Sequence, residues 1–131
     1  ISLLKTPLIN NDIAVPLDKV SKFLTAMEKK LPELDPDADV LIVSHLGDGN
    51  VHYTVWPSKD DDNHKDKIME EIENVVLTLG GSFSAEHGIG LSKLSSMERR
   101  KDRVSLEVMR QIKCAIDPKG IMNPGKIFDP A

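Results

Sequence analysis

The sequence predicts an α+β domain built on an antiparallel sheet, and three observations carry that prediction. Strand-like runs at 40–46 and 51–56 are rich in β-branched and aromatic residues, and turn-forming residues separate them. Apolar residues recur at helical spacing before and after this pair of runs. Shorter strand-like segments at 8–15 and 82–85 begin and end the series. The resulting order β-α-β-β-α-β is the ferredoxin-like split unit, and we expect its helices on one face of the sheet.

Pro16 separates the first predicted strand from the first predicted helix. We expect the strand over 8–15, although its centre is polar. The helix is expected from about Leu17 to about Leu31, and Pro32 is expected to stop it. The apolar stripe of this helix consists of Leu17, Val20, Phe23, Leu24, Met27 and Leu31.

Two histidines flank the turn between the central strands. Residues 47–50 (GDGN) tolerate positive φ and favour a four-residue hairpin loop. This loop would put His45 opposite His52, and Leu46 opposite Val51. Directly opposed residues have Cβ atoms about 4.5–5.5 Å apart, so both imidazoles can reach one metal ion. The alternative is a hairpin that carries two ordinary surface histidines.

A second helix and a fourth strand follow the hairpin. Ser58 is expected to cap this helix, and the acidic run 60–62 is expected to be its solvated start rather than a metal site. The glycine pair at 80–81 ends the helix, and a short strand is expected at 82–85. The apolar stripe of the helix consists of Ile68, Ile72, Val75, Val76 and Leu79.

Two more helices and an ordered tail are expected after the fourth strand. A short helix is predicted over 93–100 and a longer one over 104–116, and an irregular tail follows over 117–128. The longer helix carries apolar residues at intervals of four, and Cys114 lies among its apolar residues, which favours a buried thiol. The stripe consists of Val104, Val108, Ile112 and Ile116.

Composition and charge argue against several classes of function. The chain has 131 residues, of which 40% are hydrophobic and 29% charged, as expected for one globular domain. The net charge of −4 and the scarcity of aromatic residues argue against nucleic-acid binding. A single cysteine rules out an intramolecular disulfide and a cysteine-rich zinc site. No apolar run approaches the roughly 20 residues of a membrane span, and no signal peptide or secretion is expected.

The expected topology gathers three of the four histidines at one edge of the sheet. We expect the second and fourth strands to point the same way. The ends of both and the start of the third strand would then lie at one edge of the sheet. The start of the first strand, near Asn10 and Asp12, is expected at the same edge. His64 falls in the charged start of the second helix and is expected to be a plain surface residue. The gathered side chains are those of His45, His52, Glu86 and His87.

Three of these side chains form a candidate metal site. His45, His52 and Glu86 make a two-histidine, one-carboxylate set with an open position, the pattern of a catalytic divalent-metal site. Zinc fits best, with manganese or iron as alternatives. Adjacent strand residues point to opposite faces, so His87 is placed as a general base instead. The alternative is that Glu86 and His87 only satisfy backbone groups. The fourth strand would lie roughly 10 Å from the hairpin, so the loop must fold back.

Three motifs occur in order along the sequence: HLGDGNVH at 45–52, SAEHGIG at 84–90 and DPKGIMNPGK at 117–126. Together they resemble the C-terminal domain of the FAD-linked oxidases. That family includes D-lactate dehydrogenase, D-2-hydroxyglutarate dehydrogenase and the flavin subunit of glycolate oxidase. The resemblance covers the chain from about Asp12 to Phe128, and three motifs in the right order are more specific than any one of them.

The resemblance implies an FAD-dependent, metal-assisted oxidation of a D-2-hydroxy acid to the 2-oxo acid. Residues 1–131 would be a single C-terminal substrate or cap domain of a larger flavoenzyme. This piece would be inactive alone, because an N-terminal domain outside this sequence binds most of the FAD. His45, His52 and Glu86 would bind the metal, which holds the carboxylate and hydroxyl of the substrate. His87 would take the hydroxyl proton as hydride leaves for the flavin.

The resemblance also bears on Asn123, on Asn10 and on partners. Asn123 would lie near the flavin as a cofactor-binding residue. Some relatives carry a substrate-binding lysine where this sequence has Asn10, which weakens the expectation of a contact to a second substrate carboxylate there. The implied partners are the 2-hydroxy acid, an electron-acceptor protein or a quinone, and a second copy in a homodimer. The compartment would be the cytoplasm in a bacterium or the mitochondrion in a eukaryote.

Two other functions remain open at the level of sequence. A non-catalytic ferredoxin-like module that binds a ligand or a metal would share the fold, but it would not need the four gathered side chains. A small metal hydrolase that uses zinc-bound water would need an enclosed pocket, which the sequence does not offer. Reduction of a flavin by a D-2-hydroxy acid distinguishes the dehydrogenase from both.

Overall fold

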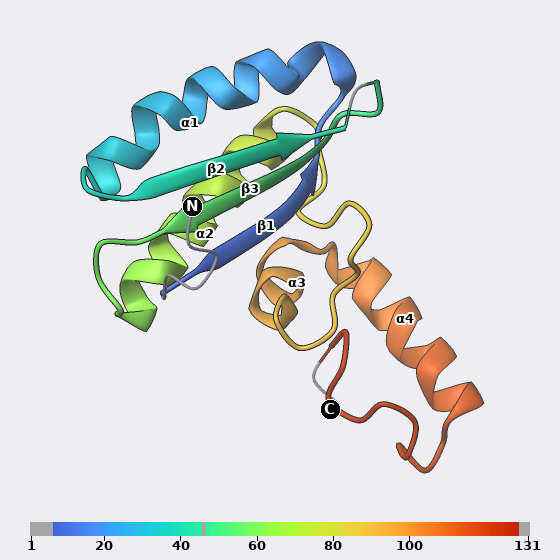
Figure 1. The fold of residues 1–131 in the computed structure, drawn as a ribbon. Coiled ribbons are helices and arrows are strands. Elements are labelled where there is room, and N and C mark those ends of the chain that lie inside the picture. Colours follow the sequence, from blue (N-terminus) through green and yellow to red (C-terminus); the bar gives the residue numbers. More distant parts are fainter. Residues whose placement is uncertain (1–6, 46, 129–131) are drawn as a thin grey trace. The chain divides into compact units, whose positions relative to one another are not determined.

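The computed structural model describes residues 7–45 and 47–128 and confirms the α+β class. The chain divides into two compact units, Ile1–His87 and Gly88–Ala131, and each is described by itself. The second unit contains α3 (Leu94–Arg100) and α4 (Arg103–Ile116). The elements of the first unit are β1 (Ile9–Ala14), a 3-10 turn η1 (Leu17–Lys19), α1 (Val20–Leu34), β2 (Asp39–Ser44), β3 (Asn50–Trp56) and α2 (Asp62–Thr78), as labelled in Figure 1.

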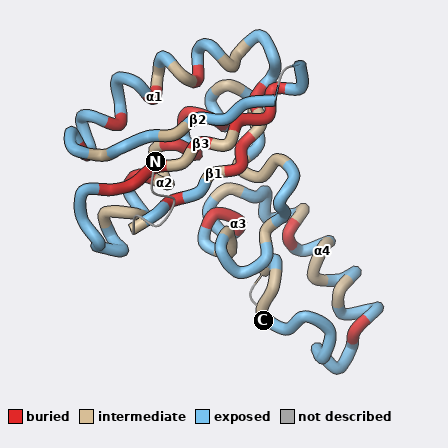
Figure 2. Tube along the Cα trace, in the orientation of Figure 1, coloured by how far each residue is buried: buried red, intermediate tan, exposed pale blue. Residues whose placement is uncertain are grey.

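The sheet of the first unit has three antiparallel strands in the order β1-β3-β2. The central strand β3 is mostly buried, whereas the edge strand β2 is mostly exposed (Figure 2). His52 of β3 pairs with Asp12 of β1 on one side and with Val43 of β2 on the other, which fixes the register of all three strands.

Both helices of the first unit pack on one face of the sheet, as predicted. Ile13 of β1 and Val51 of β3 share a buried cluster with Phe23 of α1 and Ile72 of α2. The rings of Phe23 and Tyr53 meet edge to face, with their centroids 5.5 Å apart. Because side chains alternate along a strand, the even-numbered positions of β1 and β3 face the other way. Asp12 and His52 are among these positions.

Helix α1 continues past Pro32, which the sequence predicted as its stop. The turn η1 supplies the expected start near Leu17, and Pro32 is accommodated inside the last turn, before Leu34. The N–H of Asp35 still donates to the carbonyl of Leu31 at 2.8 Å. Pro32 lacks an N–H and crowds the preceding turn, but so near the end a distortion affects only the last residues of the helix, so the helix tolerates it.

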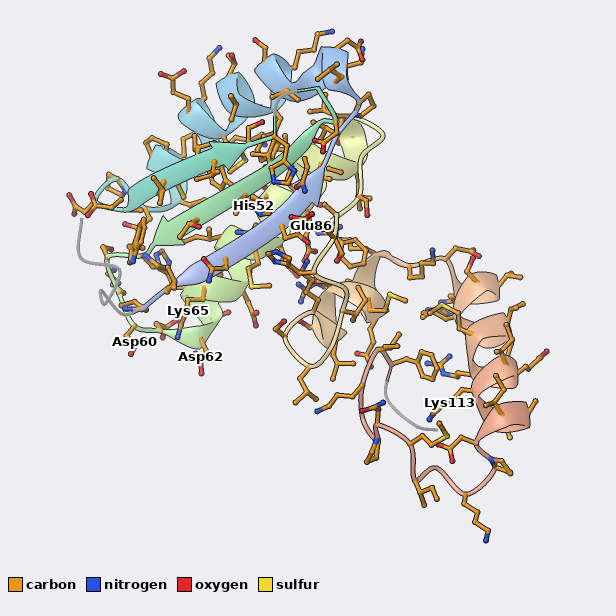
Figure 3. All side chains as sticks on the ribbon, turned by 45° about the vertical axis from the view of Figure 1, so that its right-hand side comes forward. His52, Asp60, Asp62, Lys65, Glu86 and Lys113 are labelled. Carbon is orange, nitrogen blue, oxygen red and sulfur yellow. The ribbon has the colours of Figure 1, made fainter. Side chains whose placement is uncertain are left out.

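Asp61, rather than the predicted Ser58, caps the start of α2. The Asp61 carboxylate accepts a hydrogen bond from a backbone N–H three residues on, at 2.7 Å. Asp60 and Asp62 form ion pairs with Lys65 at 2.8 and 2.9 Å (Figure 3). The acidic run is therefore the start of a helix, as predicted, although the capping residue differs.

The predicted fourth strand is reduced to one antiparallel bridge between Ala14 and Ser82. The split β-α-β-β-α-β topology is therefore incomplete. From this bridge the segment runs antiparallel to β1, back toward Asp12, so the prediction that the second and fourth strands point the same way is wrong. The backbone N–H of Ser84 lies 3.3 Å from the Ser82 hydroxyl. Such local side-chain bonds compete with a strand ladder and shorten it.

In the second unit, α4 confirms the helix predicted over 104–116, but its apolar stripe is not buried. The four stripe residues are between 48% and 71% exposed, and Leu106 is the buried residue of this helix. Cys114 is exposed as well, so the predicted buried thiol is wrong. Helical spacing fixes which side chains share a face but not which face is covered. Within the described ranges, no helix is both long and apolar enough to cross a membrane.

Candidate metal centre

The two hairpin histidines meet through a register that differs from the predicted one. His52 pairs with Val43, and the backbone N–H of His45 donates to the carbonyl of the first residue of β3 at 3.1 Å. The predicted opposition of His45 and His52 is therefore wrong by two residues, and Leu46 lies outside the described residues. Positions 43 and 45 share a face, so the two rings still meet. Their Nε2 atoms are 3.3 Å apart and their centroids 5.1 Å.

Glu86 completes a triangle with these two nitrogen atoms. Its Oε1 lies 3.3 Å from His52 Nε2 and 3.9 Å from His45 Nε2. Figure 3 shows His52 and Glu86 close together beside β1. Zinc ligands at about 2.0–2.1 Å in tetrahedral geometry lie about 3.3 Å from one another. Two edges of the triangle match that spacing, so the three predicted ligand atoms are spaced to hold one divalent ion.

A carboxylate lies near the Nδ1 atom of each hairpin histidine. Nδ1 of His45 is 3.3 Å from Asp48 Oδ2, and Nδ1 of His52 is 3.7 Å from Asp12 Oδ1. A carboxylate at Nδ1 favours a proton there and leaves the Nε2 lone pair for a metal. The hydrogen bond that the Asn50 N–H donates to Asp48, helped by His45, holds the pKa of Asp48 below its usual value. With the proton of each ring at Nδ1, both Nε2 lone pairs would face the same ion.

Sequence reasoning placed Asp12 at this edge but gave it no role. The residue is only 3% exposed. Its Oδ2 accepts hydrogen bonds from three successive backbone N–H groups, those of Ala85, Glu86 and His87, at 3.2, 3.0 and 2.8 Å. Acidic residues are buried only where partners compensate the charge. An aspartate within the predicted first strand was the sequence signal for this role.

His87 lies beside the triangle. Its side chain is 65% exposed, and its Nε2 is 3.8 Å from Glu86 Oε1. Its ring stacks on that of His52, with centroids 5.3 Å apart and an angle of 20° between the planes. The expectation that Glu86 and His87 point to opposite faces assumed an extended strand. Residues 85–87 form a loop instead, and both side chains reach the same centre.

A second set of ligand atoms overlaps the first. Asp12, His52, Glu86 and His87 each offer one ligand atom, and these atoms all lie within 4.8 Å of one another. Oδ2 of Asp12 already accepts three hydrogen bonds from N–H groups. The Nε2 atoms of His45 and His52 lie 3.3 Å apart, well within the 4.8 Å that spans the second set. The first set is therefore the better placed for an ion. Imidazole and carboxylate ligands suit zinc, manganese and iron, so the donor set fits a divalent metal without selecting one.

Asn10 lies on the same face of the sheet as Asp12. Thr54 Oγ1 donates a hydrogen bond to Asn10 Oδ1 at 3.1 Å. The two side chains form a neutral polar pair next to His52 along β3.

His64 does not join the centre, and it is not the plain surface residue that was predicted. Its Nε2 lies 2.8 Å from Oδ2 of Asp35, a residue that is 3% exposed. The backbone N–H of Ser58 donates to the same oxygen at 2.8 Å. Burial raises the pKa of Asp35, but these bonds and one from Asp37 outweigh burial and lower the pKa to about 2. The pair ties the start of α2 to the loop after α1.

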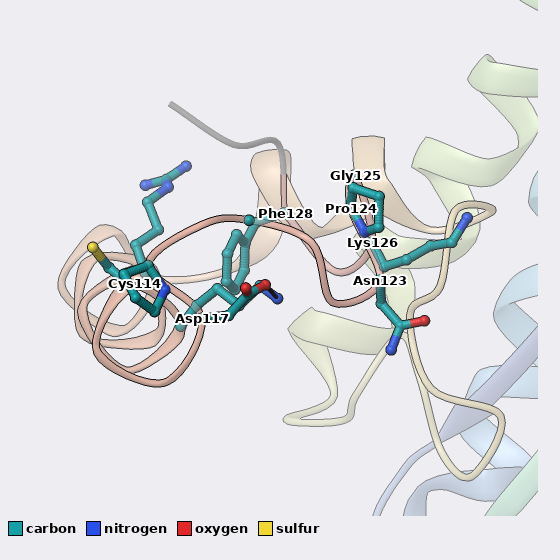
Figure 4. Close-up of a pocket in the computed structure, with 11 residues that line it drawn as sticks. Cys114, Asp117, Asn123, Pro124, Gly125, Lys126 and Phe128 are labelled. Carbon is teal, nitrogen blue, oxygen red and sulfur yellow. Dashed lines mark hydrogen bonds and ion pairs between the residues drawn. The ribbon is translucent and has the colours of Figure 1, made fainter.

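Asn123 belongs to the second unit, where it lines a pocket of about 290 Å³ (Figure 4). Asp117 shapes this pocket by accepting hydrogen bonds from Lys113 Nζ at 2.6 Å and from the Met122 N–H at 2.9 Å. These bonds, the first above all, hold the pKa of Asp117 below its usual value. The volume is at the lower end of the range for ligand sites, so the pocket admits only part of a molecule as large as FAD.

Comparison with known proteins matches the chain to one family. Residues 3–127 match the family described as FAD linked oxidases, C-terminal domain. The D-2-hydroxyglutarate dehydrogenase of Stutzerimonas stutzeri (strain A1501) is 38% identical over 125 residues, covering 90% of this chain and 26% of that protein. Glycolate oxidase subunit GlcD of Bacillus subtilis (strain 168) is 30% identical over 128 residues, covering 95% and 27%.

A third similar protein comes from a plant. The mitochondrial D-lactate dehydrogenase (cytochrome) of Arabidopsis thaliana is 30% identical over 125 residues, covering 91% of this chain and 21% of that protein. The chain thus spans about a quarter of the length of the curated relatives that it matches.

Proposed function

Since the chain belongs to the C-terminal domain family of the FAD-linked oxidases, we propose that it serves an FAD-dependent, metal-assisted D-2-hydroxy acid dehydrogenase. Residues 1–131 would act as a single substrate or cap domain of that enzyme. The reaction converts a 2-hydroxy acid to a 2-oxo acid, with the Cα hydride going to FAD and the hydroxyl proton to a protein base. D-2-hydroxyglutarate, glycolate and D-lactate, which give the relatives their names, are all 2-hydroxy acids.

The triangle of His45, His52 and Glu86 is the observation that carries this proposal. Its edges of 3.3, 3.3 and 3.9 Å suit one divalent cation, for which we favour zinc over manganese or iron. When bound, such a cation lowers the pKa of a ligating hydroxyl and attracts a carboxylate. The three side chains therefore fix where the carboxylate and hydroxyl of a 2-hydroxy acid bind.

His87 is the base in this proposal. A neutral imidazole is a suitable proton acceptor near pH 7, and the ring of His87 lies next to the triangle without belonging to it. Its exposure lets the proton pass on to solvent once the 2-oxo acid leaves. FAD supplies the two-electron oxidation when it is bound by the rest of the protein, and we assign Asn123 a contact at its edge.

The electron acceptor, the oligomeric state and the compartment are further parts of the proposal. The reduced flavin must pass its electrons on, and an acceptor protein or a quinone would receive them. A homodimer is compatible with this arrangement. The compartment would be the cytoplasm in a bacterium, or the mitochondrion in a eukaryote, which is the compartment in the name of the Arabidopsis relative.

Anaerobic mixing of the full-length protein with D-lactate, glycolate or D-2-hydroxyglutarate tests the proposal. We expect at least one of these acids to bleach the flavin absorbance, a chelator to abolish the bleaching, and zinc or manganese to restore it. The 131-residue chain alone should not turn over any of them. A full-length protein that holds metal but is not reduced by any 2-hydroxy acid would instead be a binding module.

A further inference from the structure

We propose that Asp12 is a positioning residue that holds the loop carrying Glu86 and His87 against His52. The expected effect on metal binding rests on the proposed function. The hydrogen bonds from the loop to Asp12 do not depend on a metal. Asp12 is neither a ligand of the triangle nor the base. It would act through the residues that are.

The first support is the convergence of three donors on one oxygen atom. The N–H groups of residues 85, 86 and 87 all donate to Asp12 Oδ2, at distances that fall from 3.2 to 2.8 Å along the loop. Hydrogen bonds to an ionised acceptor are roughly twice as strong as neutral ones. The negative charge of Asp12 therefore holds the backbone on which both functional side chains are carried.

The loop has little other regular structure to hold it. The fourth segment makes one bridge, at Ala14 and Ser82, and the Ala85 N–H also donates to the Asp12 carbonyl at 3.0 Å. Beyond that point the loop leaves β1, and Glu86 and His87 are both exposed. The Asp12 side chain therefore holds the backbone of these two residues where the strand pairing has ended.

The second support is the position of Asp12 behind His52. The two residues are register partners, and Asp12 Oδ1 lies 3.7 Å from His52 Nδ1. The other ring nitrogen, Nε2, faces His45 and Glu86. The two nitrogen atoms of an imidazole point in different directions, so Asp12 approaches His52 at the nitrogen that does not face the triangle. One buried carboxylate therefore accepts a hydrogen bond from the backbone of Glu86 and lies 3.7 Å from the ring of His52.

Amide hydrogen exchange in the full-length, metal-free protein tests the holding contacts directly. In the wild type we expect the N–H groups of Glu86 and His87 to exchange slowly, although their side chains are exposed. Asp12→Asn keeps the shape but removes the charge, and it should speed exchange at these two positions while leaving β3 protected. Faster exchange throughout β3 would instead show a merely structural role and overturn the proposal.

Zinc titration of the same variants tests the consequence. Asp12→Asn should weaken zinc binding about 10- to 100-fold, the usual effect of removing an outer partner of a ligand. Asp48→Asn removes the carboxylate behind His45 and should weaken zinc binding without changing exchange at 86 and 87. The exposed control Asp18→Asn should change neither.

The outcomes separate this inference from the proposed function. Rapid exchange of Glu86 and His87 in the wild type, or unchanged exchange in Asp12→Asn, would overturn the role of Asp12 even if zinc binds. Slow exchange in the wild type that Asp12→Asn abolishes would support that role even if the wild type binds no zinc. That last result would count against the metal centre alone. If Asp12→Asn does not fold, the wild-type exchange rates still decide.

Discussion

The Nε2 atoms of His45 and His52 lie 3.3 Å apart, although the two residues are not register partners in the sheet. Each Nδ1 is turned toward a carboxylate, which favours a proton on that side. With both ring protons at Nδ1, the two Nε2 lone pairs would face each other and repel unless a cation lay between them. This relationship is the strongest physical reason to expect a metal ion at the hairpin.

Removal of either hairpin histidine should therefore remove the metal. For His45→Ala and His52→Ala we expect zinc affinity to fall by more than about 100-fold, because loss of a ligand costs more than loss of an outer partner. Elemental analysis of the purified full-length variants checks this. His64→Ala is the matched control, because it removes a histidine that pairs with Asp35 away from the centre. Equal metal content in all three variants would contradict the assignment.

Replacement of His87 should separate metal binding from proton transfer. His87→Ala should slow flavin reduction by a 2-hydroxy acid by about 10²- to 10⁴-fold, the range of general-base catalysis, while the metal is retained. Stopped-flow absorbance together with elemental analysis measures both effects. Loss of metal from His87→Ala would mean that the second ligand set, which includes His87, is the real one.

Local patterns were enough to predict the helices and the hairpin, but not the hairpin register. The predicted loop included Asn50, whereas Asn50 already begins β3. Its N–H donates to the Asp48 carboxylate at 2.9 Å. This hydrogen bond ends the turn before Asn50, one residue earlier than predicted. The shift is by two residues, so each side chain keeps its face and the histidines still meet.

Other features depend on contacts that sequence patterns do not encode. The role of Asp12 arises from N–H groups 73 to 75 positions away in the sequence. The exposure of Cys114 and of the apolar stripe of α4 depends on what covers that helix, whereas helical spacing reports only which residues share a face. The gathering of Glu86 and His87 near His52 was predicted, although the strand direction used to predict it was wrong.

The hairpin loop should be intolerant of a side chain at Gly49. Its φ is +76°, and an added Cβ would lie 2.0 Å from the carbonyl oxygen of Val15. Gly80 has nearly the same φ, +77°, but nothing lies within 4 Å of such a Cβ. We expect Gly80→Ala to lower the free energy of unfolding by about 1–2 kcal/mol, and Gly49→Ala by more than about 3 kcal/mol. Urea unfolding measures the difference, and equal losses would show that Val15 yields.

The contact between His64 and Asp35 should make the stability of the first unit depend on pH. The pKa of Asp35 is lowered to about 2 in the folded chain, against about 3.9 in an unfolded one. A depressed carboxyl pKa contributes stability that is fully present above the unfolded value and is lost as pH falls toward the folded value. We therefore expect a loss of about 2 kcal/mol between about pH 5 and pH 2 from this group.

Asp35→Asn should remove that part of the pH dependence, because an amide does not titrate and cannot form the ion pair with His64. Asp66→Asn, at an exposed position of α2, is the matched control and removes a carboxyl without touching these bonds. Urea unfolding at pH 2.5, 4 and 6 gives the comparison. The wild type and Asp66→Asn should lose stability in parallel as pH falls, whereas Asp35→Asn should start lower at pH 6 and lose less. Parallel curves for all three proteins would show that the bonds to Asp35 do not stabilise the fold.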